Sequence, residues 1–130
     1  PLSSLLTSDP RCRFIHGDFF AMSGSHFQGF DPDTRSRKFH AILLDIDHSP
    51  TELLHPRHAS FYEAEGLRQL AFHLKPEGIF ALWSNDPPEE RFQIALSEVF
   101  ATQDTHVITF SNPLSQGLEA SNTIYVARNM

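Results

Sequence analysis

Two short, continuous apolar runs constrain the fold of this chain more than any other feature. They occupy residues 39–46 and 79–84 and read "FHAILLDI" and "IFALWS". An uninterrupted run, without alternation of polar residues, is typical of a strand buried on both faces of a parallel sheet. Between the runs, apolar residues at helical spacing predict an amphipathic helix that stops by Pro76 and Gly78; they are Leu67, Leu70, Ala71 and Leu74. The order strand, helix, strand predicts a parallel pair joined by a helical crossover.

The flanking segments extend this α/β pattern. We predict a strand at 11–16 closed by Gly-Asp, a helical turn at 19–22, a loop at 23–37, a helix within 86–100, and strands at 105–110 and 122–128. The loop 111–121 between the last two strands is too short for a helical crossover. The fold class predicted for 1–130 is therefore one α/β domain, with parallel strands that end in an antiparallel hairpin.

Composition excludes several classes of function. The net charge is −6 and no cluster of Lys and Arg occurs, which argues against a nucleic-acid partner. Cys12 is the sole cysteine, so an internal disulfide is excluded. No apolar run approaches the roughly 18 residues of a membrane-spanning helix. We expect a soluble, cytoplasmic protein without a membrane partner.

Four stretches resemble the spermidine-synthase-like family of the S-adenosylmethionine-dependent methyltransferase fold. "RFIHGD" resembles the family's strand that ends in Gly-Asp, and "FHAILLDIDHSP" resembles its aspartate-rich strand and loop. "FYEAEGLRQLAFHLKPEGIFALW" resembles its next helix and strand, and "NTIYVAR" its closing strand. The resemblance covers nearly all of 10–130 and implies the C-terminal portion of a Rossmann-like methyltransferase sheet. The family's Gly-rich loop and ribose-binding acidic residue would precede Pro1, so the N-terminal cofactor-binding half is expected to be absent from this chain.

Candidate site residues follow from where parallel strands end. Ligands of open α/β sheets bind beyond the carboxyl ends of the strands, where segments 16–19, 45–49 and 84–86 are expected. The resemblance implies cofactor binding by Gly17, Asp18 and Phe19, with Asp18 accepting a hydrogen bond from the adenine amino group and Phe19 beside the ring. Asp18 is equally suited to cap the following helical turn.

Asp45 matches the family's catalytic aspartate, which also lies against the co-substrate. Its carboxylate would hold a protonated amine and accept its proton before the amine attacks the carbon next to the sulfonium. We expect Asp45 to be buried at the end of its apolar strand. The alternative is a strand-end aspartate that binds the backbone amides of its own turn.

The loop after Asp45 departs from the family. The family reads Asp-Ser-Ser-Asp where this chain reads Asp-Ile-Asp-His at 45–48, so His48 replaces the second aspartate. A histidine would hold a diammonium substrate poorly and would suit an acidic or neutral acceptor better; His48 is also a candidate general base. Asp47 is a candidate substrate ligand, although in an extended loop it would point away from His48. Asn85 or Asp86 is expected to touch the acceptor; for Asp86 the alternative, which we prefer, is the N-cap and first turn of the next helix.

A metal site is the alternative to these roles. Asp45, Asp47, His48, His55 and His58 are all of ligand type. Their spacing fits no zinc signature, and Pro56 interrupts any helix that would align the two later histidines. We therefore expect no metal.

Three functions remain open. The first is a transferase that uses S-adenosylmethionine or its decarboxylated form, closest to spermidine synthase, and moves an aminopropyl group to an amine acceptor. The second is a methyltransferase acting on a small molecule, and the third is a non-catalytic nucleoside-binding domain. In each case the partner is a small molecule, and homo-oligomerisation stays open.

Overall fold

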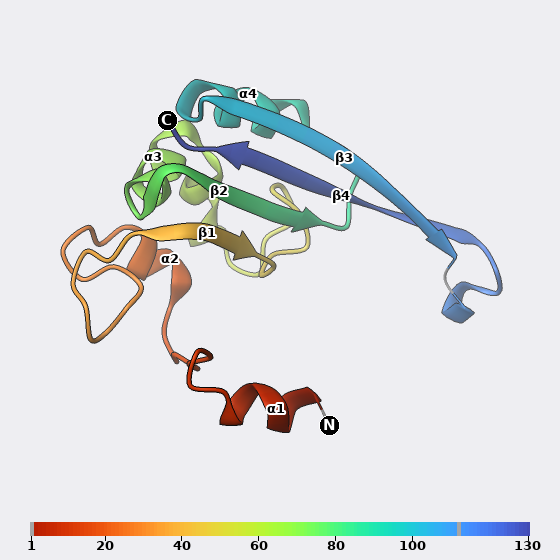
Figure 1. Cartoon of the computed structure of the whole chain (residues 1–130). Coiled ribbons are helices and arrows are strands. Elements are labelled where there is room, and N and C mark those ends of the chain that lie inside the picture. Colours follow the sequence, from red (N-terminus) through yellow and green to blue (C-terminus); the bar gives the residue numbers. More distant parts are fainter. Residues whose placement is uncertain (1, 112) are drawn as a thin grey trace.

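The structure is a computed structural model that describes residues 2–111 and 113–130. Within these residues the strands form one four-stranded sheet in the order β1-β2-β4-β3 (Figure 1). The strands are β1 (Phe39–Leu44), β2 (Leu74–Ser84), β3 (Thr102–Ser111) and β4 (Glu119–Arg128). β1 and β2 are parallel, whereas β4 is antiparallel to both β2 and β3. The predicted α/β fold and terminal antiparallel hairpin are confirmed, as a mixed sheet with one parallel pair among the described strands.

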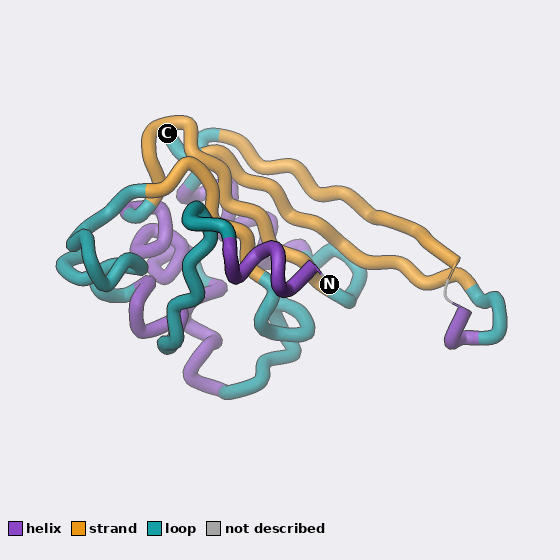
Figure 2. The backbone as a smooth tube through the Cα atoms, turned by 60° about the horizontal axis from the view of Figure 1, so that its bottom comes forward, coloured by secondary structure: helices purple, strands orange, loops and turns teal. Residues whose placement is uncertain are grey.

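Helical segments connect these strands. They are α1 (Leu2–Ser8), α2 (Phe19–Ser23), the 3₁₀ helix η1 (Pro56–Tyr62), α3 (Ala64–Phe72), α4 (Glu90–Val99) and the 3₁₀ turn η2 (Pro113–Ser115). η1 and α3 lie between β1 and β2 in the chain, and α4 lies between β2 and β3. α1 buries none of its residues and stands apart from the sheet (Figure 1). The β3–β4 hairpin projects beyond the rest of the molecule and carries η2 at its tip (Figure 2).

The strand predicted at 11–16 is wrong. Residues 12–18, all described, contain no strand, and Phe14 is 73% exposed. Arg13 instead forms ion pairs with Asp31 and Asp33 of the following loop, at 3.2 and 2.7 Å. The segment carries too few apolar residues to offset the cost of ordering a strand, and these ion pairs hold it on the loop. β1 is consequently an edge strand of the described sheet.

The helix end was also misplaced. α3 ends at Phe72, and the His73 backbone N–H caps it by donating to carbonyls of the last turn. Leu74 is the first residue of β2, where it is almost fully buried, and Pro76 and Gly78 lie in the early part of that strand. The helix therefore ends, and β2 begins, before the position that Pro76 indicated.

One face of the sheet holds the core. Phe80 and Leu82 of β2 lie opposite Ala127 and Tyr125 of β4, and all four are at most 1% exposed. The helices pack their apolar sides onto this face, through Leu67, Leu70, Phe92 and Leu96. On the other face the alternate residues are half-buried or exposed, with Leu43 76% exposed. Our expectation that the apolar strands are buried on both faces is wrong for the described chain, because its helices cover only one face.

Candidate functional site

The loops that follow β1 and β2 meet at the carboxyl end of the parallel pair. The backbone N–H of Asn85 donates to the carbonyl of His48 at 2.9 Å and joins the two loops directly. Segments 45–49 and 84–86 therefore come together as the sequence predicted. Segment 16–19 does not lie at a strand end, because no strand forms before it among the described residues.

Asp45 is the first residue beyond β1. It is exposed, not buried as expected, and its carboxylate has no hydrogen-bond partner among the described residues. The alternative role in binding turn amides is not seen. Asp45 borders a shallow groove of about 260 Å³ on the open face of the sheet, together with Leu43, Trp83 and Ile124. It is thus a free carboxylate at the rim of an apolar groove.

Asp47 points to the opposite side of the loop and is completely buried. Its carboxylate accepts hydrogen bonds from the Tyr62 hydroxyl and the Leu54 N–H, both at 2.7 Å, and from His58 Nδ1 at 3.0 Å. We call Asp47, His58 and Tyr62 the buried cluster. Because its oxygens are enclosed by three donors, Asp47 does not reach a ligand at the surface.

The hydrogen bonds also set the charge state of the buried cluster. Burial by itself raises the pKa of the Asp47 carboxyl, but the hydrogen bonds from His58, the Leu54 N–H and Tyr62 outweigh it and lower this pKa. Burial and the Asp47 charge raise the pKa of Tyr62, so its hydroxyl stays a donor. The His58 ring stacks on Phe20 with centroids 3.8 Å apart, which ties α2 to η1.

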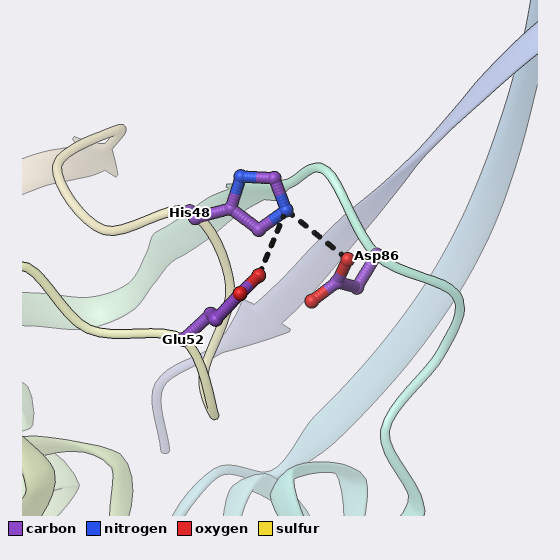
Figure 3. A group of neighbouring side chains, drawn as sticks. All are labelled: His48, Glu52 and Asp86. Carbon is purple, nitrogen blue, oxygen red and sulfur yellow. Dashed lines mark hydrogen bonds and ion pairs between the residues drawn. The ribbon is translucent and has the colours of Figure 1, made fainter.

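His48 belongs to a second, exposed group with Glu52 and Asp86 (Figure 3). Its Nε2 lies 3.1 Å from Asp86 Oδ1 and 3.2 Å from Glu52 Oε2. We call these three residues the exposed cluster. Sequence reasoning missed Glu52, since a four-residue spacing from His48 signals a contact only on a helix, and this segment is a loop. Sequence reasoning also assigned Asp86 to a helix start, whereas α4 begins at Glu90 with Glu89 as its N-cap.

Asn85 orients the His48 ring. Its Oδ1 accepts from Asn122 Nδ2 at 2.7 Å and from Trp83 Nε1 at 3.3 Å, so its amide nitrogen faces His48 Nδ1 at 3.4 Å. Nδ1 is therefore the acceptor, and the ring hydrogen belongs on Nε2, toward the carboxylates. The Nδ1 lone pair of His48 and both polar ends of the Asn85 side chain are thus engaged within the protein.

The predicted cofactor residues are differently placed. Asp18 caps α2 by accepting from the N–H groups of Phe20 and Ala21 at 3.0 and 3.3 Å, which confirms the capping alternative. Its second oxygen lies 3.3 Å from Arg57. Phe19 packs inward, with its ring 4.9 Å from that of Phe30.

The cap nevertheless borders a hollow. Asp18, Phe20 and Arg57 help to line a cavity of about 530 Å³ between α2, η1 and α3. Gly17, just before it, has Met22 so close that an added Cβ would lie 2.9 Å from its Sδ. Cofactor binding by Gly17, Asp18 and Phe19 stays a prediction.

Comparison with known proteins assigns no family. No family model matches the chain, and no curated protein matches it either. Among the described residues no helix has the length and apolar character needed to cross a membrane. The sheet and the groups at its carboxyl end are therefore the features from which a function can be inferred.

Proposed function

We propose that this chain is the C-terminal half of a S-adenosylmethionine-type group transferase, closest to spermidine synthase, which transfers an aminopropyl group to an amine acceptor. The observation that carries the proposal is Asp45, an exposed carboxylate without a partner among the described residues, directly beyond the carboxyl end of β1. Strand ends of this kind are where open α/β sheets bind ligands. A soluble small-molecule substrate and a cytoplasmic location follow from this assignment.

The order of the strands supports the same assignment. The resemblance implies parallel strands followed by an antiparallel hairpin that closes a Rossmann-like methyltransferase sheet. The observed sheet has a parallel β1–β2 pair, and its last strand, β4, is inserted antiparallel between β2 and β3. The uncovered face of this sheet agrees with a domain whose N-terminal half lies outside these residues.

Electrostatics favours a cationic acceptor more than the sequence alone suggested. His48 replaces the family's second aspartate, but Glu52 and Asp86 stand within 3.2 Å of its Nε2. Two carboxylates beside the ring return negative charge to this part of the loop. An ammonium group of the acceptor would be attracted to it and to Asp45.

In the proposed reaction Asp45 accepts a proton from the ammonium group of the acceptor. The freed nitrogen lone pair forms a bond to the propyl carbon next to the sulfonium, and the carbon–sulfur bond breaks. Its electron pair stays on sulfur, so the products are a neutral thioether nucleoside, the aminopropylated amine and a protonated Asp45. The carboxylate acts both as an anchor for the cation and as a general base.

Methyl transfer to a small molecule is the second candidate. The presence of His48 in place of the family's second aspartate favours it, because a histidine suits a neutral acceptor better than a diammonium one. A third candidate, binding of a nucleoside without catalysis, is favoured by the cavity beside Asp18 and Phe20.

The test combines binding with turnover. Thermal shifts are measured on the full-length protein, with this chain joined to its proposed N-terminal half, in the presence of S-adenosylmethionine, decarboxylated S-adenosylmethionine and methylthioadenosine. We expect the decarboxylated form to stabilise most; a preference for S-adenosylmethionine would select methyl transfer, and stabilisation without turnover would select the nucleoside-binding domain. Stabilisation by none of the three overturns all three candidates.

The role of Asp45 is tested by Asp45→Asn in an assay with putrescine and decarboxylated S-adenosylmethionine. Turnover should fall about 100-fold or more, which is typical for loss of a general base. Asp104→Asn is the matched control, since Asp104 is also exposed but lies on β3. Unchanged turnover in Asp45→Asn would remove the proposed base.

A further inference from the structure

We propose that the exposed cluster, His48, Glu52 and Asp86, is a binding site for a divalent transition-metal cation of the zinc class. This goes beyond group transfer and does not depend on it. It also departs from the expectation of no metal, which considered the histidines and aspartates of one loop and included neither Glu52 nor Asp86.

Donors and acceptors in the exposed cluster do not balance. Asp86 Oδ1 and Glu52 Oε2 both approach the same nitrogen, His48 Nε2, at 3.1 and 3.2 Å. This nitrogen carries at most one hydrogen, so two carboxylates share a single donor. A cation bound in place of that hydrogen would interact with both carboxylates at once.

The spacing of the donor atoms suits one metal ion. All three ligand atoms lie within 4.8 Å of one another. Nitrogen and oxygen ligands lie about 2.1 Å from zinc, so two of them at a tetrahedral angle stand about 3.4 Å apart. The two observed distances from His48 Nε2 are close to this value. A metal ion would therefore need only small shifts of the side chains shown in Figure 3.

The loops hold the donors in place while leaving room for further ligands. The Asn85 N–H to His48 carbonyl bond joins the loop of His48 to that of Asp86. His48, Glu52 and Asp86 have side chains 48%, 71% and 38% exposed. Three protein ligands on an open surface leave the fourth tetrahedral position to water or to a ligand, as in open zinc sites.

The side chain of Asn85 limits the affinity of the proposed metal site. Coordination at Nε2 moves the ring hydrogen to Nδ1, where Asn85 presents its amide nitrogen and not an acceptor. A carboxylate at this position would accept that hydrogen, as carboxylates commonly do behind zinc-bound histidines. Asn85→Asp should therefore tighten metal binding about tenfold, whereas the natural residue keeps it moderate.

The experiment titrates zinc and, separately, magnesium into this chain in the absence of nucleoside. Isothermal calorimetry measures binding, and the fluorescence of Trp83 reports it locally, because its Nε1 bonds to the Asn85 side chain. Zinc should bind at one site that loses affinity at least tenfold in His48→Gln and in Glu52→Gln. Magnesium should bind far more weakly, because it prefers oxygen ligands alone.

The matched control is His40→Gln, an exposed histidine at the opposite end of β1. It should leave zinc binding unchanged. Equal zinc affinity in His48→Gln and the natural chain, or the absence of saturable binding, overturns the site. Each variant changes an exposed side chain, and circular dichroism verifies that it is folded. Because no nucleoside is present, failure here leaves the proposed transferase function untouched, and the reverse holds as well.

Discussion

The two histidine–carboxylate clusters begin at neighbouring residues, yet their environments are opposite. Asp47 turns inward, where one carboxylate receives three donors. His48 turns outward, where one ring nitrogen faces two carboxylates. Extended backbone sends successive side chains to opposite sides, so a single step along the chain separates the clusters. The same residue types thus form a fully hydrogen-bonded, buried group on the inner side of the loop and an exposed group with more acceptors than donors on its outer side.

The ratio of donors to acceptors explains the difference in what each cluster can do. In the buried cluster every Asp47 oxygen is satisfied, so no capacity is left for a ligand. In the exposed cluster an acceptor remains without a hydrogen, so capacity for a cation is left. The buried cluster therefore has a stabilising role, and the exposed cluster keeps the proposed binding role.

Removing the buried carboxylate should produce the largest effect. In Asp47→Ala, three donors lose their acceptor, and two of them, His58 Nδ1 and the Tyr62 hydroxyl, are buried. We expect the free energy of unfolding to fall by about 3–5 kcal/mol, as when one partner of a buried ionic pair is removed. Urea denaturation followed by circular dichroism measures the loss.

Asp86→Ala is the matched change in the exposed cluster. It should lower the free energy of unfolding by about 1 kcal/mol or less, because exposed ion pairs contribute little. Equal losses in the two variants would contradict the division into a stabilising and a binding cluster.

A smaller change, Tyr62→Phe, tests one donor of the buried cluster. The hydroxyl donates to Asp47 Oδ2 at 2.7 Å, and the ring still packs against Phe61 and Phe92 after its removal. A hydrogen bond to a charged group contributes about 1.5–3 kcal/mol, and we expect a loss of that size in urea denaturation. Tyr125→Phe, which removes an acceptor for the neutral Glu89 N–H, should cost about 1 kcal/mol. The reverse order would show that the Asp47 charge adds nothing.

Lowering the pH should reduce the stability that the buried cluster contributes, and this is the next largest effect. The folded protein holds the pKa of Asp47 below its ordinary value of 3.8, because hydrogen bonds from His58, Leu54 and Tyr62 outweigh the opposing effect of burial. A depressed folded pKa adds stability that is fully present above the unfolded value and is lost as pH falls through the folded value. The free energy of unfolding should thus decline as the pH is lowered below 3.8.

Urea denaturation at stepped pH values measures this decline. In Asp47→Asn the slope should be shallower by up to one proton, or about 1.4 kcal/mol per pH unit. A residual slope is expected, because the hydrogen bond from Arg37 and further contacts lower the pKa of Asp31 to about 2. A slope equal to that of the natural chain would show that Asp47 is not the titrating group.

The sequence predicted the framework of the fold but not the partition between the clusters. The apolar runs at 39–46 and 79–84 and the short loop before the last strand carry local signals, and both the parallel pair and the hairpin form. The prediction of a strand at 11–16 was wrong because a strand needs a partner strand and a buried face, and the residues of the segment itself do not show whether either exists. Burial on both faces failed for the same reason: an apolar pattern shows what a strand can bury, not which element covers it.

The candidate site was predictable only where one loop contains the whole signal. Asp45 and His48 lie at the expected strand end, and the opposite direction of Asp47 followed from extended geometry. Asp86 was missed as a partner of His48 because the two residues lie 38 positions apart in the chain. Glu52 was missed because its four-residue spacing from His48 indicates a contact only on a helix. The Asp47–His58 contact was likewise hidden, since η1 brings His58 back under the loop.

The smallest expected change in the free energy of unfolding is that of a substitution at His48, which can be compared directly with the same substitution at His58. His48→Gln removes a ring that is 48% exposed and paired with two exposed carboxylates, so the free energy of unfolding should change by about 0.5 kcal/mol or less. His58→Gln, the matched change, removes a ring that donates to buried Asp47 and stacks on Phe20, and should cost about 2–3 kcal/mol. Urea denaturation of both variants at neutral pH measures the difference. If the two histidines contributed equally, solvent exposure and the balance of donors would not govern the two clusters, and a binding role for the exposed cluster would lose its physical basis.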